Sequence, residues 1–172
     1  RQYRSAQRMS LKPVAVLAYG NPSRGDDALA PCLLDRIELM IGTQQLPDSC
    51  ELINDFQLQI EHTLDIQGRS QLLFIDASMN ATAPFEFSNL QAAQDDSISS
   101  HALSPAALLT VYEQVHQETA PQAFLLAIPG YEFELGEPLS RQAEDNLRQA
   151  TEFCAQLLSD QRLERWKSLA SR

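Results

Sequence analysis

The chain of 172 residues has few cysteines and no long hydrophobic run. Both features limit the classes of protein to which it can belong. Cys32, Cys50 and Cys154 show no CxxC spacing, so the sequence offers no zinc motif and no dithiol redox motif. An odd, sparse cysteine count suits a reducing compartment, where thiols stay free. No apolar run reaches the length of a membrane-spanning helix. We therefore expect a cytoplasmic protein with no membrane partner.

Positive charge is also scarce. Thirteen Lys and Arg residues stand against 23 Asp and Glu residues, which gives a formal net charge of −10. Proteins that bind nucleic acid usually carry a basic stripe, and none is visible here. The first eight residues are basic, but no apolar segment follows them, so they do not form a secretory signal. We expect residues 1–11 to be a flexible extension, and we expect no nucleic-acid partner.

Signatures of the common nucleotide and hydrolase sites are missing as well. The glycine-containing stretch Gly20–Gly25 is not a P-loop, because no Gly-Lys-Ser/Thr follows it. It also lacks the third glycine of the dinucleotide fingerprint. The chain has no Gly-x-Ser-x-Gly nucleophile elbow and no His-Glu-x-x-His helix. Chemistry in this chain must therefore come from another set of residues.

What the chain does have is an alternation of strand and helix patterns from end to end. Short apolar or alternating runs predict five strands, at residues 13–19, 51–55, 71–77, 84–88 and 123–128. Apolar residues at helical spacing predict helices at residues 27–41, 60–66, 105–117 and 140–158. Such alternation is typical of a three-layer α/β/α domain with a mostly parallel, twisted sheet. We expect one α/β domain over residues 12–159 and a charged, loosely attached tail over residues 160–172.

Several local features have purely structural explanations. Asp26 or Asp27 suits the N-cap of the helix at 27–41, and Ser104 suits the N-cap of the helix at 105–117. In the helix at 60–66 we expect Ile60, Leu64 and Thr63 to face inward. We expect His62 and His116, both on helices, to lie at the surface.

Three residues nevertheless converge on one edge of the expected sheet. Asp27 follows the first strand, Asp76 ends the third, and His101 lies in a polar loop before a helix. Ligand sites of open α/β sheets lie at the carboxyl ends of the strands. Two carboxylates and an imidazole suit a divalent transition metal and leave coordination positions open. The alternatives remain a helix-capping Asp27, a loop-bonding Asp76 and a surface His101.

The same residues carry a resemblance to a known family. Gly20–Asp27 with its Gly-Asn-Pro-x-x-Gly-Asp-Asp pattern, Phe74–Ala77 and Ser100–Pro105 look like the motifs of the hydrogenase maturation endopeptidases. The resemblance spans about residues 14–158. Gln57–Glu61 and Phe133–Ser140 resemble the branch that serves bidirectional, NAD(P)-linked hydrogenases.

The resemblance implies an endopeptidase that removes the C-terminal extension of a nickel–iron hydrogenase large-subunit precursor after nickel insertion. It implies that Asp27, Asp76 and His101 are both the catalytic residues and the ligands of nickel, which the precursor supplies and for which other divalent ions can substitute. It also implies a substrate loop, composed of Gly20, Asn21, Gly25 and Asp26. We expect the precursor to be the partner and the protein to be a monomer.

The chain departs from the family pattern at three places. Ala18 stands where the family commonly has the first glycine of Gly-x-Gly-Asn, and Ala28 stands where a glycine often follows the second acid. After the second strand, Asp55-Phe-Gln replaces the frequent Asp-Gly-Gly. These changes affect the expected shape of the substrate loop more than the metal ligands.

Two other functions fit parts of the pattern. Tyr19-Gly-Asn-Pro also resembles the start of peptidyl-tRNA hydrolases, but the His that family needs shortly after this loop is replaced by Asp-Asp-Ala-Leu-Ala. The net charge of −10 argues against tRNA too. A non-enzymatic chaperone that binds metal or precursor would use the same three ligands, so the sequence leaves it open.

Overall fold

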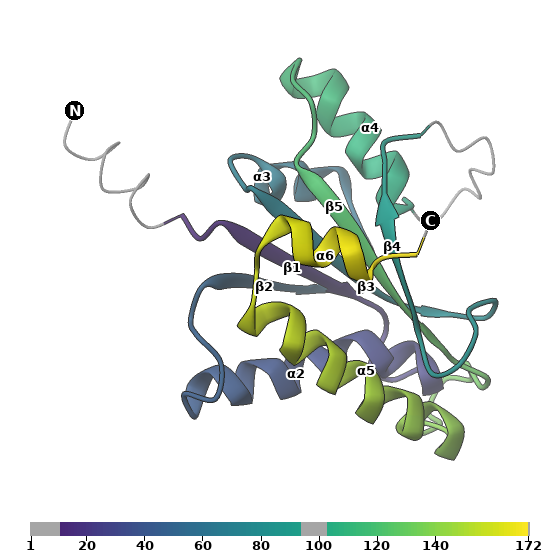
Figure 1. Ribbon diagram of the computed structural model, residues 1–172. Helices are drawn as coiled ribbons and strands as arrows, with labels where there is room; N and C mark the ends of the chain where they lie inside the picture. The colour runs from purple at the N-terminus through teal and green to yellow at the C-terminus, as the bar shows by residue number, and fades with distance from the viewer. Residues whose placement is uncertain (1–10, 94–102, 172) are drawn as a thin grey trace.

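The computed structural model describes residues 11–93 and 103–171, and a five-stranded sheet forms its centre (Figure 1). The strand order is β2-β1-β3-β5-β4. The first four of these are mutually parallel, and β4 runs antiparallel to β5 at the edge. The strands are β1 Val14–Tyr19, β2 Cys50–Asp55, β3 Gln71–Ser78, β4 Glu86–Leu90 and β5 Gln122–Pro129. The prediction of an α/β fold with a mostly parallel, five-stranded sheet is confirmed.

Helices cover both faces of the sheet, which explains the unbroken apolar runs in its central strands (Figure 1). Helices α2, α5 and α6 pack on one face, and α3 and α4 pack on the other. Each face therefore has its own buried apolar cluster. The helical elements are η1 Gly25–Ala28, α2 Leu29–Gly42, η2 Ile60–His62, α3 Thr63–Ile66, α4 Pro105–His116, α5 Arg141–Ser159 and α6 Leu163–Leu169. No helix in the described ranges is long and apolar enough to cross a membrane.

Two serine caps form, whereas the expected aspartate cap does not. The backbone N–H of Ala107 donates to Ser104 Oγ at 3.1 Å, which confirms Ser104 as the N-cap of α4. Ser140 caps α5 in the same way. The prediction that Asp26 or Asp27 caps the first long helix is wrong, because both lie inside η1 and no side chain caps α2. The two acids are thus free for other contacts.

The short segment after β2 differs from the expected helix. It forms η2 followed by one turn of α3, and Ile60 and Leu64 are exposed instead of facing inward. Thr63 is buried as expected, together with Ile66. His62 is also buried, so the expectation that it lies at the surface is wrong. Two turns are too few for apolar spacing to identify the buried face.

His116 is not a free surface residue either. Its ring stacks on Tyr112 with the centroids 4.5 Å apart, and its Nε2 atom is buried. The expectation of a surface position for His116 is therefore only partly met, because the ring is half-buried.

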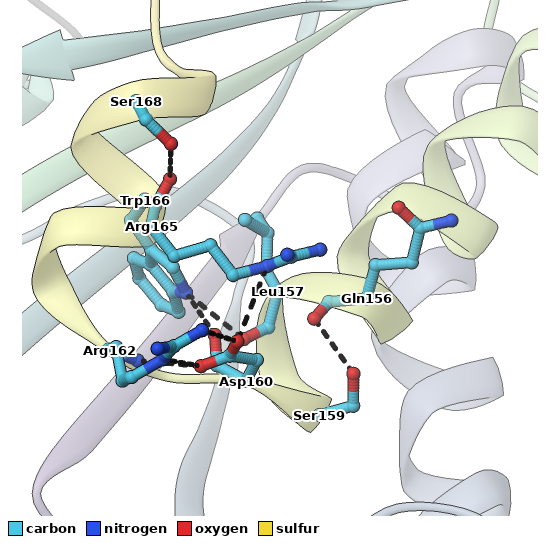
Figure 2. A network of polar contacts seen from close by, with 8 residues as sticks. All are labelled: Gln156, Leu157, Ser159, Asp160, Arg162, Arg165, Trp166 and Ser168. Atoms are coloured by element: carbon cyan, nitrogen blue, oxygen red, sulfur yellow. Dashed lines mark hydrogen bonds and ion pairs between the residues drawn. The ribbon is translucent and has the colours of Figure 1, made fainter.

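The tail after Ser159 is packed on the domain, which corrects the expectation of loose attachment. The Trp166 side chain on α6 is fully buried and meets the Phe124 ring edge-on, with centroids 5.4 Å apart. Figure 2 shows its Nε1–H donating to the carbonyls of Leu157 at 3.0 Å and Asp160 at 3.1 Å. Beyond α6, the N–H of Ser171 donates to the Phe87 carbonyl of the edge strand β4. The tail thus contributes to the core.

Candidate functional site

A tight turn after β1 positions Asp27 at the carboxyl edge of the sheet. A Cβ atom on Gly20 would collide with the carbonyl oxygen of Asp27, so only glycine allows the two segments to approach this closely. The backbone N–H of Asn21 donates to Asp27 Oδ2 at 2.7 Å. The turn and η1 together orient the Asp27 carboxylate and leave its other oxygen without a hydrogen bond inside the described ranges.

Asp76 reaches the same edge from β3, the neighbour of β1 in the sheet. Burial and, to a lesser extent, the charge of nearby Asp27 together raise the pKa of Asp76 to about 7, although the Tyr19 hydroxyl and the Ala77 N–H act in the opposite direction. A carboxyl group with this pKa exchanges its proton near neutral pH. The structure therefore brings Asp27 and Asp76 together; their catalytic and metal-binding roles stay predictions.

Tyr19 is a site residue that the sequence analysis did not single out. Its hydroxyl is buried and has no hydrogen bond of good geometry within the described residues. Burial, and secondarily the charge of Asp76, raise the pKa of Tyr19 well above its ordinary value. The hydroxyl therefore keeps its proton and can donate it toward Asp76. Its position directly before Gly20 was the only sequence signal.

The third predicted ligand, His101, lies outside the described residues. Within those residues no group of three or more His, Cys, Asp or Glu side chains is arranged to hold a metal. Asp27 and Asp76 supply hard oxygen donors suited to a divalent cation, and one imidazole would complete a mixed site. The donor set is compatible with a metal ion that brings further ligands of its own.

Asp26 is hydrogen-bonded to a different segment and organises the loop after β5. Its side chain is fully buried and accepts hydrogen bonds from the N–H groups of Tyr131, Glu132 and Ser140 at 2.7, 3.0 and 2.7 Å. The Ser140 hydroxyl donates to it as well, at 2.7 Å. Burial alone would raise the pKa of Asp26, but these hydrogen bonds outweigh burial and lower it. Asp26 thus joins η1 to the loop after β5 and to the start of α5.

Gly25 lets that loop approach η1. Its φ angle is +50°, in the left-handed region that favours glycine, and a Cβ here would collide with the Glu132 carbonyl oxygen. Its N–H donates to the carbonyl of Glu137 at 3.1 Å. Of the four residues predicted to form a substrate loop, Gly20 and Asn21 contact Asp27, whereas Gly25 and Asp26 hold the loop after β5.

A second polar pair at this edge went unnoticed in the sequence. Asp55 ends β2, and its Oδ2 atom lies 3.3 Å from Nε2 of the buried His62. The Gln59 N–H donates to His62 Nδ1 at 2.8 Å, so a neutral ring carries its proton on Nε2, the nitrogen that lies near Asp55. Sequence spacing could not reveal the pair, because it depends on the tight turn between β2 and η2.

Fold and edge geometry define a class: a doubly wound α/β domain with acidic side chains at the carboxyl ends of adjacent strands, where such sheets bind ligands. Among solved structures, the chain is similar to a [NiFe] hydrogenase maturation protease, HycI from Thermococcus kodakarensis. The TM-score is 0.65 and the identity 18%, over 91% of this chain and 99% of that one. It is also similar to the hydrogenase maturating endopeptidase HybD from E. coli. That TM-score is 0.62 and the identity 21%, over 84% and 91% of the two chains.

A hydrogenase 2 maturation peptidase from a Thaumarchaeota archaeon has the same fold, with a TM-score of 0.61 and 20% identity over 86% of this chain and 98% of that one. No protein-family model matches the chain, and no curated protein matches it in sequence. The similarity therefore establishes the fold, because the alignment covers nearly the whole length of each of these structures.

Proposed function

We propose that this protein is an endopeptidase that removes a C-terminal extension from the large-subunit precursor of a nickel–iron hydrogenase after nickel insertion. The observation that carries the proposal is the meeting of Asp27 and Asp76 at the carboxyl edge of a sheet whose fold is that of hydrogenase maturation proteases. The similarity of Gln57–Glu61 and Phe133–Ser140 to one branch suggests a bidirectional, NAD(P)-linked hydrogenase as the source of the precursor. We propose further that the protein acts in the cytoplasm as a monomer.

The metal in this proposal belongs to the substrate. Asp27, Asp76 and His101 would bind nickel already held by the precursor, and other divalent ions would be able to substitute. Carboxylate and imidazole groups can share a metal that retains open positions. Bound in this way, the nickel would fix the scissile peptide relative to the carboxylates and polarise it. A nickel-free precursor would lack this anchor and escape cleavage.

Asp76 is the residue best suited to proton transfer. With a pKa of about 7, its carboxyl group can accept and return a proton at neutral pH. The Asp27 carboxylate, fixed by the Asn21 N–H, would stay directed at the cation. The buried Tyr19 hydroxyl would act as a donor to Asp76. Both acids would thereby contact the metal, and Asp76 would also exchange the proton.

The test compares the nickel-loaded and nickel-free precursor, with mass spectrometry of the precursor's C-terminus after incubation. We expect cleavage of the loaded form alone. Asp76→Asn and His101→Ala should abolish it while thermal unfolding stays cooperative, and Asp35→Asn, an exposed change on α2 with the same loss of charge, should cleave normally. Equal cleavage of both precursors would refute the nickel requirement. Binding of the loaded precursor without cleavage would instead identify a chaperone, and release of tRNA from peptidyl-tRNA would identify the other hydrolase class.

A further inference from the structure

A small hollow lies beside the carboxylate pair, on the β2 side of the Gly20 turn. Its volume is about 190 Å³, and its lining consists of Gly20, Pro22, Asn54, Asp55 and Phe56. Asp55 carries the only formal charge among these residues. The Gly20 N–H donates to the Asp55 carbonyl at 3.1 Å, and the Asn21 N–H donates to Asp27. One turn therefore forms a wall of the hollow and also orients the predicted metal ligand.

The Asp55 carboxylate is held in place, but it can accept further hydrogen bonds. Its Oδ1 atom accepts from the Phe56 N–H at 2.7 Å, and its Oδ2 atom faces Nε2 of His62 at 3.3 Å. A carboxylate has about four lone-pair sites, so capacity remains on both oxygens. The side chain is 41% exposed, whereas that of His62 is 8% exposed. His62 is thus a buried support that fixes the direction of an accessible acid.

Phe56 gives the hollow a chemistry of its own. The residue is 67% exposed although it is large and apolar, and it follows Asp55 directly. An accessible aromatic face next to a fixed carboxylate suits a cation, because the ring attracts it through its π electrons and the acid through its charge. A guanidinium or ammonium group on a flexible chain has the size and the donors to use both.

We propose that this hollow is a subsite for one cationic side chain, arginine or lysine, of the polypeptide that the carboxylate pair processes. Asp55 and Phe56 contact that side chain, and His62 is a positioning residue for Asp55. The inference rests on the proposed function only in assigning the ligand to a peptide substrate. Because the Gly20 turn is shared, a side chain bound in the hollow fixes the adjacent backbone near Asp27 and Asp76.

Binding can be tested without catalysis. The full chain is titrated with N-acetyl-arginine amide, and with its neutral isostere N-acetyl-citrulline amide, while backbone amide resonances of Gly20, Asn54 and Phe56 are followed by NMR. We expect saturable shifts with the arginine probe and dissociation constants at least about fivefold larger with citrulline, since a half-exposed ion pair and a cation–π contact each contribute modestly. Equal affinity for the two probes overturns the proposal.

Variants locate the bound cation. Asp55→Asn should weaken the arginine probe about fivefold or more, and Phe56→Gly should weaken it by severalfold. Asp35→Asn, which removes one exposed acid from α2, should leave the dissociation constant unchanged. If Asp76→Asn abolishes the shifts and Asp55→Asn does not, the cation sits on the carboxylate pair and the proposal fails.

A matched pair of variants tests the role of His62. His62→Gln keeps a donor that can reach Asp55, whereas His62→Leu removes it, so the glutamine variant should bind the probe more tightly. Equal weakening by both variants, with both folded by circular dichroism, would assign His62 a merely structural role. Arginine-probe binding without precursor cleavage would refute the proposed function and leave the subsite, and cleavage without probe binding would refute the subsite alone.

Discussion

Asp76 combines a buried position with a nearby like charge, and both work against ionisation in the folded chain. Its pKa is raised from the ordinary 3.8 to about 7, chiefly by burial and then by Asp27. Between these pH values the native state retains a proton that the unfolded chain releases. The contribution of Asp76 to folding stability is therefore fully present below pH 4, and it is lost as pH rises through 7. The site is built at a cost in stability.

Asp76→Asn should remove this cost. At pH 8 the variant should be more stable than wild type by up to about 4 kcal/mol, because a shift of about three pKa units corresponds to that energy. The advantage should shrink toward pH 4. Urea unfolding of both proteins at pH 5 and pH 8 measures the difference, and Asp35→Asn reports the effect of losing an exposed charge. A gap between variant and wild type that stays constant with pH would contradict the assignment.

Asp26 has the opposite character, since its pKa is lowered by hydrogen bonds from Ser140, Tyr131 and Glu132 that outweigh burial. Asp26→Asn places an amide donor among N–H donors, and we expect a loss of about 2–3 kcal/mol at pH 7. The charged form stabilises the fold above the unfolded pKa, and this stability disappears as pH falls through the lower folded pKa. The loss should therefore be larger at pH 7 than at pH 3. Urea denaturation at both values checks the prediction; a penalty that grows on acidification would refute it.

At the scale of elements, α6 closes the core beside α5. The tail has few apolar residues and many charged ones, which predicts a solvated segment. The Trp166 ring is nevertheless fully buried, and its N–H donates to two backbone carbonyls. Asp160 and Arg162 pair at 2.7 Å at the start of this turn (Figure 2). Burial of one large side chain thus attaches α6 to the core although most of the surrounding residues are charged or polar.

Trp166→Ala should destabilise the protein by about 3–5 kcal/mol, because a full ring is deleted from a packed interior. Trp166→Phe should cost less, since it keeps ring contact with Phe124 but loses the two indole hydrogen bonds. Lys167→Ala, exposed on the same helix, is the matched control. Thermal unfolding followed by circular dichroism ranks the three variants. Equal midpoints for Trp166→Ala and Lys167→Ala would mean that α6 is dispensable.

Elements also show where local patterns fail. The segment 60–66 has apolar residues at helical spacing, but it forms only two short turns, and its buried face is set by the His62–Asp55 contact and the sheet instead. Asp26 and Asp27 have the sequence positions of helix caps. Asp26 instead accepts hydrogen bonds from backbone N–H groups of residues 131–140. Local propensity loses in both places to contacts between segments distant in sequence.

For the whole molecule, the alternation of strand and helix patterns was sufficient to predict the sheet, its parallel character and the two helical layers. The convergence of Asp27 and Asp76 followed from the same reasoning, because carboxyl ends of parallel strands share one edge. The roles of Tyr19, Asp55 and His62 could not be predicted. Those depend on which side chains point to the same face at strand ends and on the depth of burial there, which one sequence does not encode locally.

Because Asp27 and Asp76 meet only in the folded chain, a divalent cation that they bind must stabilise the fold. At a free Ni²⁺ concentration of 100 times its dissociation constant, the free energy of unfolding should rise by about 2.7 kcal/mol. Asp76 must lose its proton to bind, and its pKa of about 7 predicts that affinity falls about tenfold from pH 8 to pH 6. Urea unfolding with Ni²⁺ and with EDTA at both pH values measures this on a chain without a polyhistidine tag. Asp35→Asn should respond like wild type, and Asp27→Asn combined with Asp76→Asn should not respond. An equal rise at both pH values, or a rise that survives in the double variant, would place the cation elsewhere on this acidic surface.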